Sequence, residues 1–239
     1  FGGRWAFHYL GTYQTEEEAA KAPNDPNAQG RKKHAGDAIF EDVNNDGQLD
    51  SKDMIFMGYV RPDKVGGIIN TLKYKGLTVR IVMDWAMGHV IDNGFKGQIM
   101  GSSRNNNNAI KEAMTNSWQS ANDGSKYPKY TVQSDYDYQY RNHMRWDNQI
   151  GSSASGSTNN SLYFSKGDYL AFREVSLSYM LPLSWIRKMR LSAVEVFAGA
   201  YNIGYIKKYD GMFPEIYTGV DYGIYPRPRQ YNMGVKINF

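Results

Sequence analysis

The last nine residues of the chain constrain its fold more than any other stretch. Across Tyr231–Phe239, apolar and polar side chains alternate without exception. The apolar row is Tyr231, Met233, Val235, Ile237 and Phe239, and the residues between them are Asn232, Gly234, Lys236 and Asn238. Because successive side chains of a strand point to opposite faces, the pattern predicts a β-strand with one apolar face. A strand that crosses a membrane in a barrel needs this alternation over ~10 residues.

Composition narrows the possible classes of protein. No run of apolar residues approaches the ~18 that a membrane helix requires, so a helical membrane protein is excluded. The mean hydropathy of −0.62 does not exclude a transmembrane barrel, because alternating strands disappear in hydropathy averages. The absence of cysteine excludes disulfides and thiolate metal sites. The one basic cluster, Arg31–His34, has no interleaved aromatic residues, so we expect no nucleic-acid partner.

Residues Asp42–Asp53 form an oxygen-rich loop with the spacing of an EF-hand calcium loop. The expected ligands, at positions 1, 3, 5, 7, 9 and 12, are Asp42, Asn44, Asp46, Gln48 (through its backbone carbonyl), Asp50 and Asp53. Gly47 permits the sharp turn at position 6, and we expect Leu49 to point into a core. Closely packed oxygen ligands repel one another without a cation, so the loop predicts a structural Ca²⁺ site. The alternative is an ion-free turn held by Asx hydrogen bonds.

Five stretches have the alternation of membrane-crossing strands. They are residues 66–74, 77–88, 170–181, 191–203 and 230–239. The second of them carries six apolar residues on one face, with Arg80 and Asp84 on the other. Burying that charged face in a protein core is costly, whereas a wet barrel lumen accommodates it. Lys75-Gly76 predicts a two-residue hairpin turn before this strand.

The next two strands have less regular faces. In the third, we expect one face to carry Ala171, Val175, Leu177, Tyr179 and Leu181, and the other Glu174, Ser176 and Ser178. In the fourth, both rows contain apolar residues: Val194, Val196, Ala198 and Ala200 lie opposite Glu195, Phe197, Gly199 and Tyr201. Thr15 followed by three Glu residues predicts a short helix over 15–21. A further short helix is expected over 109–118.

The connections between the five strands run short, long, short, long, as alternating periplasmic turns and outer loops do. The long excursion over residues 89–169 contains aromatic residues that could stack on a sugar. These candidates for substrate binding are Tyr136, Tyr138, Tyr140 and Trp146. The alternative is ordinary packing inside a folded loop. Five strands are fewer than the ~8 of the smallest membrane barrel, so the sheet must be completed by other strands.

Several stretches together resemble one known family, the SusC/RagA-type TonB-dependent outer-membrane transporters of Bacteroidota. The stretches are Gly36–Asp50 (GDAIFEDVNNDGQLD), Leu72–Asp84 (LKYKGLTVRIVMD), Tyr169–Pro182 (YLAFREVSLSYMLP), Val194–Ile203 and Tyr225–Phe239 (YPRPRQYNMGVKINF). The chain looks like the C-terminal portion of such a protein. The family's plug, its TonB box and most of its about 22 strands are absent here.

The resemblance implies an all-β fold: part of an antiparallel transmembrane β-barrel, with long extracellular loops and short helices in the loops. Residues 1–65 would be an extracellular loop region and residues 66–239 the barrel segment. The implied function is import of glycans or peptides across the outer membrane of a Gram-negative bacterium. The implied partners are a SusD-like surface lipoprotein, outer-membrane lipid and, through the missing N-terminal part, the TonB complex. The terminal Phe239 resembles the signal by which barrels are recognised for assembly.

Two other classes of protein compete with a transporter. One is a soluble, calcium-stabilised, β-rich module that binds carbohydrate through its Tyr- and Trp-rich loops. The other is a β-sandwich glycosidase, which needs a carboxylate pair that the sequence does not single out. His8, His34, His89 and His143 lie far apart without metal-ligand spacing. We therefore expect no catalytic residues.

Overall fold

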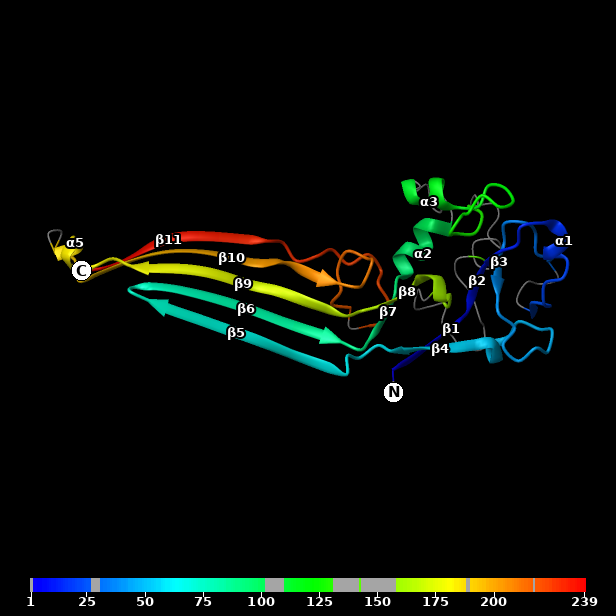
Figure 1. Cartoon of the computed structure of the whole chain (residues 1–239), viewed down its shortest axis with the longest axis horizontal. Helices are drawn as coiled ribbons and strands as arrows, with labels where there is room; N and C mark the ends of the chain where they lie inside the picture. Colours follow the sequence, from blue (N-terminus) through cyan, green and yellow to red (C-terminus); the bar gives the residue numbers. More distant parts are fainter. Residues whose placement is uncertain are drawn as a thin grey trace. The chain divides into compact units, whose positions relative to one another are not determined.

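The computed structural model describes residues 2–26, 31–101, 110–130, 142, 158–187, 190–216 and 218–239. The chain divides into two compact units. The first consists of Phe1–Arg61, Val90–Lys166 and Glu215–Ile224, and the second of Pro62–His89, Gly167–Pro214 and Tyr225–Phe239. Figure 1 identifies the elements of each unit by label and colour.

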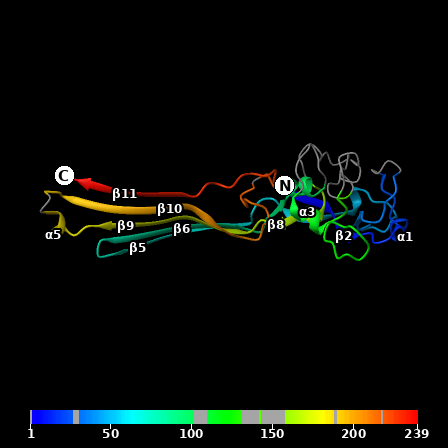
Figure 2. The same ribbon diagram turned by 90° about the horizontal axis from the view of Figure 1, so that it is seen from above.

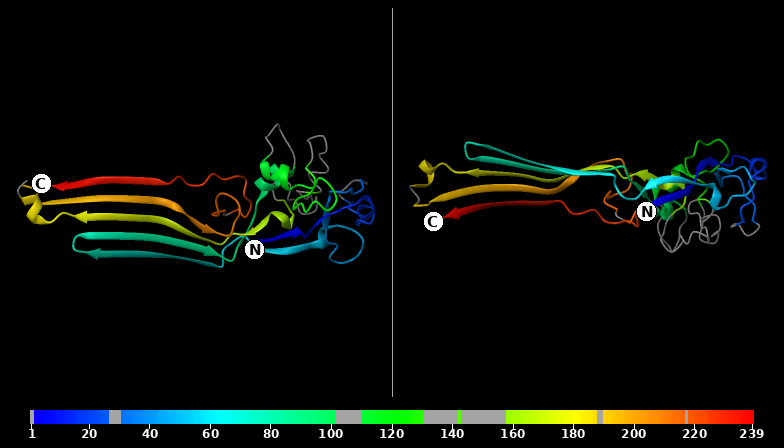
Figure 3. Two further views of the ribbon diagram at one scale, coloured as in Figure 1. Left: turned by 45° about the horizontal axis from the view of Figure 1, so that its top comes forward. Right: turned by 90° about the horizontal axis from the view of Figure 1, so that it is seen from below.

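The second unit is built on one five-stranded antiparallel sheet. Its strands are β5 (Lys64–Tyr74), β6 (Leu77–Met87), β9 (Tyr169–Met180), β10 (Ala193–Lys207) and β11 (Gln230–Asn238). They lie in the order β11-β10-β9-β6-β5. Each of these strands therefore pairs with the one of the five that comes before or after it along the chain. Figures 1 and 3 show them side by side in this order, and Figure 2 shows that they form a single layer. All five expected strands are confirmed.

The hairpin between β5 and β6 has the tight turn that the sequence predicts. Tyr74 pairs with Leu77, which leaves Lys75 and Gly76 as the two turn residues. Both have positive φ, 45° and 85° respectively. A two-residue turn of this kind matches the right-handed twist of the flanking strands. Gly76 adopts its conformation without strain, whereas Lys75 does so at a cost.

One expected face assignment in β9 is wrong. Ala171 pairs with Asp84 and Tyr205, so it lies on the polar face of the sheet and not beside Val175. The reason is a β-bulge: Glu174 pairs with Val82 and Phe172 with Met83, which leaves Arg173 as an extra residue. One extra residue reverses the side-chain alternation that follows it. The bulge has no signature in the sequence pattern.

The first unit contains three two-stranded sheets among its described residues. They pair β1 (Gly3–Phe7) with β4 (Met54–Tyr59), β2 (Tyr9–Thr12) with β3 (Ala38–Phe40), and β7 (Val90–Asp92) with β8 (Phe164–Lys166). Its helices are α1 (Glu16–Ala19), α2 (Gly94–Gly101) and α3 (Lys111–Asn116), with 3-10 turns η2 (Ser51–Asp53) and η6 (Ser161–Tyr163). These strands were not predicted, because three to six residues carry too little alternation.

Two of the helices in this unit were predicted from their local signals. Thr15 caps α1 by accepting the backbone N–H of Glu18 at 3.2 Å, as its sequence indicates. The helix expected over 109–118 is α3. Among the described residues of this unit, one apolar cluster packs around Phe7, Phe40 and Leu49 and another around Met100, Tyr127 and Tyr163. Within the described residues, no helix is long and apolar enough to span a membrane.

Candidate functional site

The five-stranded sheet has one apolar and one polar face. Residues that pair across antiparallel strands point to the same side, so the register assigns both faces. The apolar face carries Ile68, Leu72 and Tyr74 of β5, Leu77, Val79, Ile81, Met83 and Trp85 of β6, Val175, Leu177 and Tyr179 of β9, and Val194, Val196, Ala198 and Ala200 of β10. The polar face carries Thr71, Lys73, Thr78, Arg80, Asp84, Glu174, Ser176, Ser178, Tyr201 and Asn232. The expected two-faced pattern is present, except that the bulge in β9 moves Ala171 to the polar face.

The terminal strand completes the apolar face. Tyr231, Met233, Val235 and Ile237 pair in turn with Ala200, Ala198, Val196 and Val194 of β10. All four terminal-strand side chains are exposed, Met233 to 87%. A row of this size left open to the surroundings fits lipid better than water. Phe239 follows the last residue of β11 and is also exposed.

Two ion pairs cross the polar face. Arg80 of β6 lies 3.3 Å from Glu174 of β9, whose other oxygen accepts the hydroxyl of Ser176 at 2.7 Å. Nearer the loop end, Arg173 binds both carboxylate oxygens of Asp84, one of them at 2.7 Å. Arg173 also donates to the Tyr205 hydroxyl at 3.2 Å. The sequence pattern indicates Arg80 and Asp84 as polar-face residues but not Arg173. The side chain of Arg173 reaches this face only because of the bulge.

A shallow hollow of about 390 Å³ lies on the polar face beside Arg80. Hydroxyl, amide and cationic side chains line it together with the rings of Phe197 and Tyr201. Gly234 of the terminal strand leaves room for one of these rings, since a Cβ there would meet Phe197 at 2.6 Å. The hollow therefore offers hydrogen-bonding groups and aromatic surface to a polar ligand.

The calcium-type loop in the first unit is folded by its own side chains. The carboxylate of Asp42 accepts the backbone N–H groups of Asp46 and Gly47 at 3.2 and 2.9 Å. Asn44 also accepts the N–H of Asp46, and Asp46 accepts that of Gln48, both at 2.9 Å. Gly47 has the positive φ, 77°, that its place in the turn requires. Leu49 is buried in the core around Phe7, as expected.

The remaining two expected ligands hold the end of this loop. Asp50 caps η2 by accepting the N–H of Lys52 at 2.8 Å. Asp53 is fully buried and accepts the N–H groups of Val43 and Asp50 at 3.0 and 2.8 Å. In the described residues, no three His, Asp or Glu side chains gather closely enough to hold a metal ion. The geometry is that of consecutive Asx turns, which both the calcium hypothesis and its ion-free alternative accommodate.

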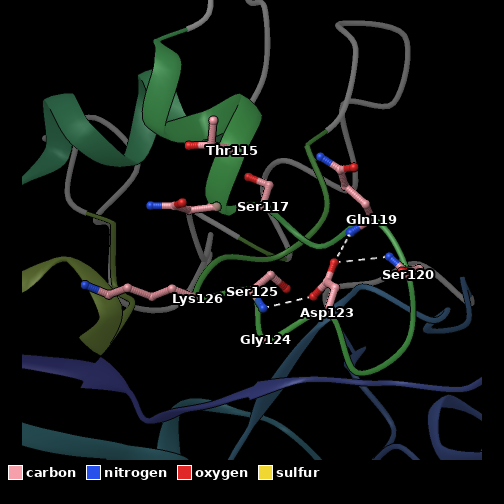
Figure 4. A pocket seen from close by; sticks show the side chains of 9 residues that line it. Thr115, Ser117, Gln119, Ser120, Asp123, Gly124, Ser125 and Lys126 are labelled. Atoms are coloured by element: carbon pink, nitrogen blue, oxygen red, sulfur yellow. Dashed lines mark hydrogen bonds between the residues drawn. The ribbon is translucent and has the colours of Figure 1, made fainter.

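A second pocket, of about 530 Å³, lies in the loop that follows α3 (Figure 4). Asp123 organises this loop by accepting the N–H groups of Gln119, Ser120 and Ser125 at 2.7, 3.2 and 2.9 Å. These hydrogen bonds hold the pKa of Asp123 well below its usual value, and the bond from Gln119 has the largest effect. Ser117 is buried, and its hydroxyl has no hydrogen-bond partner in the described part of the chain. Hydroxyl and amide side chains make up most of the lining, together with Asp123, Gly124 and Lys126, and such a lining suits a hydroxyl-bearing ligand.

The four aromatic residues expected to stack on a sugar, Tyr136, Tyr138, Tyr140 and Trp146, lie outside the described residues. That hypothesis therefore stays a prediction. The two hollows described above, on the polar face and in the loop that follows α3, were not predicted. Each combines residues whose spacing in the sequence has no recognisable pattern.

Comparisons with known proteins point to one kind of fold. No protein-family model matches the chain. TonB-dependent receptor P3 of Formosa agariphila is 24% identical over 100% of the chain, and TonB-dependent receptor P26 of the same organism is 24% identical over 97%. The chain covers 22% of each of these proteins. It thus spans about a fifth of the length of the curated relatives it matches.

Solved structures give the same result. The RagAB peptide transporter matches 99% of the chain with a TM-score of 0.68 at 17% identity, and the chain covers 23% of the matched protein. The RagAB peptide importer in its "closed-closed" state matches 98% with a TM-score of 0.63 at 19% identity, covering 23% of it. These comparisons confirm the resemblance to SusC/RagA-type TonB-dependent transporters. They also confirm the fold class, an all-β fold that forms part of an antiparallel β-barrel.

Proposed function

We propose that the chain is the C-terminal barrel segment of a TonB-dependent outer-membrane importer. The observation that carries this proposal is the two-faced sheet of β5, β6, β9, β10 and β11, whose apolar side is exposed and whose polar side holds paired charges. Its two edges, β5 and β11, have no further strand partner among the described residues. Unpaired edges are not tolerated in lipid, so each needs another barrel strand.

On this proposal β11 pairs with the first strand of the barrel, which this chain does not contain. Tyr231, Met233, Val235 and Ile237 then face lipid, and Phe239 serves as an assembly signal. The short turns at Lys75-Gly76 and at 181–192 lie on the periplasmic side. The first unit, with the calcium-type loop, lies outside the cell. The role is structural and transport-related, without catalysis.

The cargo we propose is a glycan, with peptide as the alternative. The pocket behind α3 supports a glycan, because hydroxyl and amide groups dominate its lining. The RagAB proteins are a peptide transporter by name, which favours the alternative. We further propose that the whole protein works with a SusD-like lipoprotein and is driven by the TonB complex. The resemblance to SusC/RagA-type transporters supports a partner of this kind.

We also propose that the loop Asp42–Asp53 binds Ca²⁺ as a structural clip of modest affinity. Support comes from the ligand spacing, the positive φ of Gly47 and the burial of Leu49. Asp53 stands where EF-hand loops have a bidentate Glu, which is the reason for modest affinity. Thermal unfolding with and without chelator tests this. If chelator lowers the unfolding temperature of the wild type but not of Asp46→Ala, the calcium site is supported. If chelator changes the unfolding temperature of neither protein, the loop is the ion-free turn.

The full-length protein tests the transporter proposal directly. We expect it to fractionate with outer membranes, to require detergent for extraction and to migrate differently on gels before and after heating. The competing soluble carbohydrate-binding module predicts the opposite. Recovery of these 239 residues as a stable monomer without detergent would overturn the transporter proposal. Uptake assays with glycan and peptide mixtures in a deletion strain then decide between the two cargoes.

A further inference from the structure

The connection between β9 and β10 contains a short helix, α5 (Leu183–Ile186), with an unusual surface. Leu183 and Trp185 are 56% and 65% exposed, whereas Ile186 is only 2% exposed. Pro182 precedes the helix and ends β9, because proline cannot donate to a sheet ladder. A turn in water gains nothing by displaying Leu and Trp together, so this pair indicates an apolar environment.

The helix α5 lies against β10 at the turn end of the sheet. Val194 and Val196 of β10 both lie on that face, yet Val194 is 7% exposed and Val196 is 43% exposed. The helix packs against β10, and its own Ile186 is buried. The burial of Val194 and Ile186 is explained if they contact each other beneath α5. Figure 1 shows α5 and the C-terminus at the same end of the sheet.

Two arginines lie within four residues of the end of α5. Arg187 is its C-cap, and the backbone N–H of Arg190 donates to the carbonyl of Arg187 at 3.1 Å, which closes a turn. Both side chains are exposed, and neither has a carboxylate partner within the described part of the chain. A guanidinium presents a planar fork of donors that fits two phosphate oxygens. The turn therefore combines interfacial apolar residues with two cations.

We propose that Leu183, Trp185, Arg187 and Arg190, here called the α5 anchor, bind an anionic phospholipid in the periplasmic leaflet. Trp185 and Leu183 lie among the glycerol and upper acyl groups, where indole is favoured. Arg187 and Arg190 hold the headgroup phosphate. The site is continuous with the apolar face of β9 and β10, which selects a bilayer lipid over a soluble protein partner. This inference rests on the proposed barrel and its sidedness.

Lipid titration of the full-length protein tests the role of the arginines. The delipidated protein in detergent is titrated with phosphatidylglycerol or phosphatidylcholine of equal chain length, and bound lipids are counted by native mass spectrometry. We expect phosphatidylglycerol to bind more tightly, and R187Q/R190Q to weaken it by roughly 30-fold. Lys236→Gln removes a charge at the same end of the sheet but on the polar face, beside Glu195, and should have no effect. Equal binding by wild type and R187Q/R190Q would overturn the proposal.

Membrane depth gives an independent test of Trp185. These 239 residues contain no cysteine, so once any cysteine elsewhere in the full-length protein is replaced, a nitroxide can be attached at Trp185→Cys in liposomes. We expect greater accessibility to oxygen and less to a water-soluble nickel complex than for a label at Ser178→Cys on the polar face. A label at 185 as open to nickel as the control refutes the α5 anchor while leaving the barrel intact. Failure of the protein to enter liposomes at all refutes the proposed function instead.

Discussion

Arg173 of β9 and Asp84 of β6 form a bidentate ion pair, because a β-bulge turns the Arg173 side chain to the polar face. The pair is partly shielded, with side-chain exposures of 21% and 34%. Arg173 also packs over the ring of Tyr205, with 5.7 Å between the guanidinium carbon and the ring centre. A bulge that places a cation beside an anion and an aromatic ring fixes the register of β6, β9 and β10 at this level.

Removing the Arg173 side chain should reduce the stability of the folded protein more than removing that of Arg80, a more exposed arginine on the same face. Arg173→Met leaves the Asp84 carboxylate unpaired, and we expect about 1–3 kcal/mol of lost stability. Arg80→Met on the same face should cost less, because Arg80 is 42% exposed and bonds Glu174 through one nitrogen. Denaturant unfolding of the full-length protein in detergent measures both. Equal losses would contradict a special role for the bulge pair.

Asp53 should stabilise its loop whether or not calcium binds. Its buried carboxylate accepts two backbone N–H groups, from Val43 and Asp50. An amide has one acceptor oxygen, so Asp53→Asn leaves one of these donors unpaired, at a cost of about 1–3 kcal/mol. We expect faster hydrogen exchange at the Val43 and Asp50 amides, with the same increase in chelator and in Ca²⁺. An effect seen only in Ca²⁺ would make Asp53 a metal ligand first and a turn residue second.

The sequence was sufficient to predict elements whose own residues determine them. The strand β11 alternates strictly, and β6 carries an unbroken apolar row opposite Arg80 and Asp84, so the faces of both follow from periodicity alone. Lys75-Gly76 and the Thr15 cap act over two to four residues and were also correct. Features that depend on distant partners were not predictable. Arg173 reaches Asp84 only through a bulge, and the pairs β1–β4 and β7–β8 join segments that are short and separated by long stretches of chain.

The turn between β5 and β6 contains a strained residue that can be improved. Lys75 has φ of 45°, a conformation that Asn and Gly tolerate better than Lys. Lys75→Asn should therefore raise stability by roughly 0.5–1 kcal/mol, since Asn-Gly is favoured in such turns. Gly76→Val should do the reverse, because a β-branched residue resists positive φ and its Cβ would meet the Met180 carbonyl at 2.8 Å. Unfolding midpoints of the two variants should move in opposite directions.

The loop behind α3 should lose its order in acid. The backbone N–H groups of Gln119, Ser125 and Ser120 lower the pKa of Asp123 in the folded state below the ordinary value of an Asp side chain. A lowered pKa means that the stabilisation is present above the unfolded value and is lost as pH falls below it. We expect the protection of the Gln119 and Ser125 amides, measured relative to intrinsic exchange at each pH, to fall as the pH drops below about 4. In Asp123→Asn this protection should already be low at neutral pH and should not change with acid in this range.

The apolar row of the terminal strand should tolerate charge far less than its polar row. Val235 lies at the middle of β11 and faces the apolar side, where Arg at the bilayer midplane costs about 2–4 kcal/mol. Val235→Arg should therefore reduce the amount of heat-modifiable, folded protein in outer membranes. Asn232→Arg provides the matched control, since Asn232 lies on the same strand but points to the polar face. If both variants assemble equally well, the apolar face does not contact lipid, and the sheet belongs to a different architecture from the one proposed.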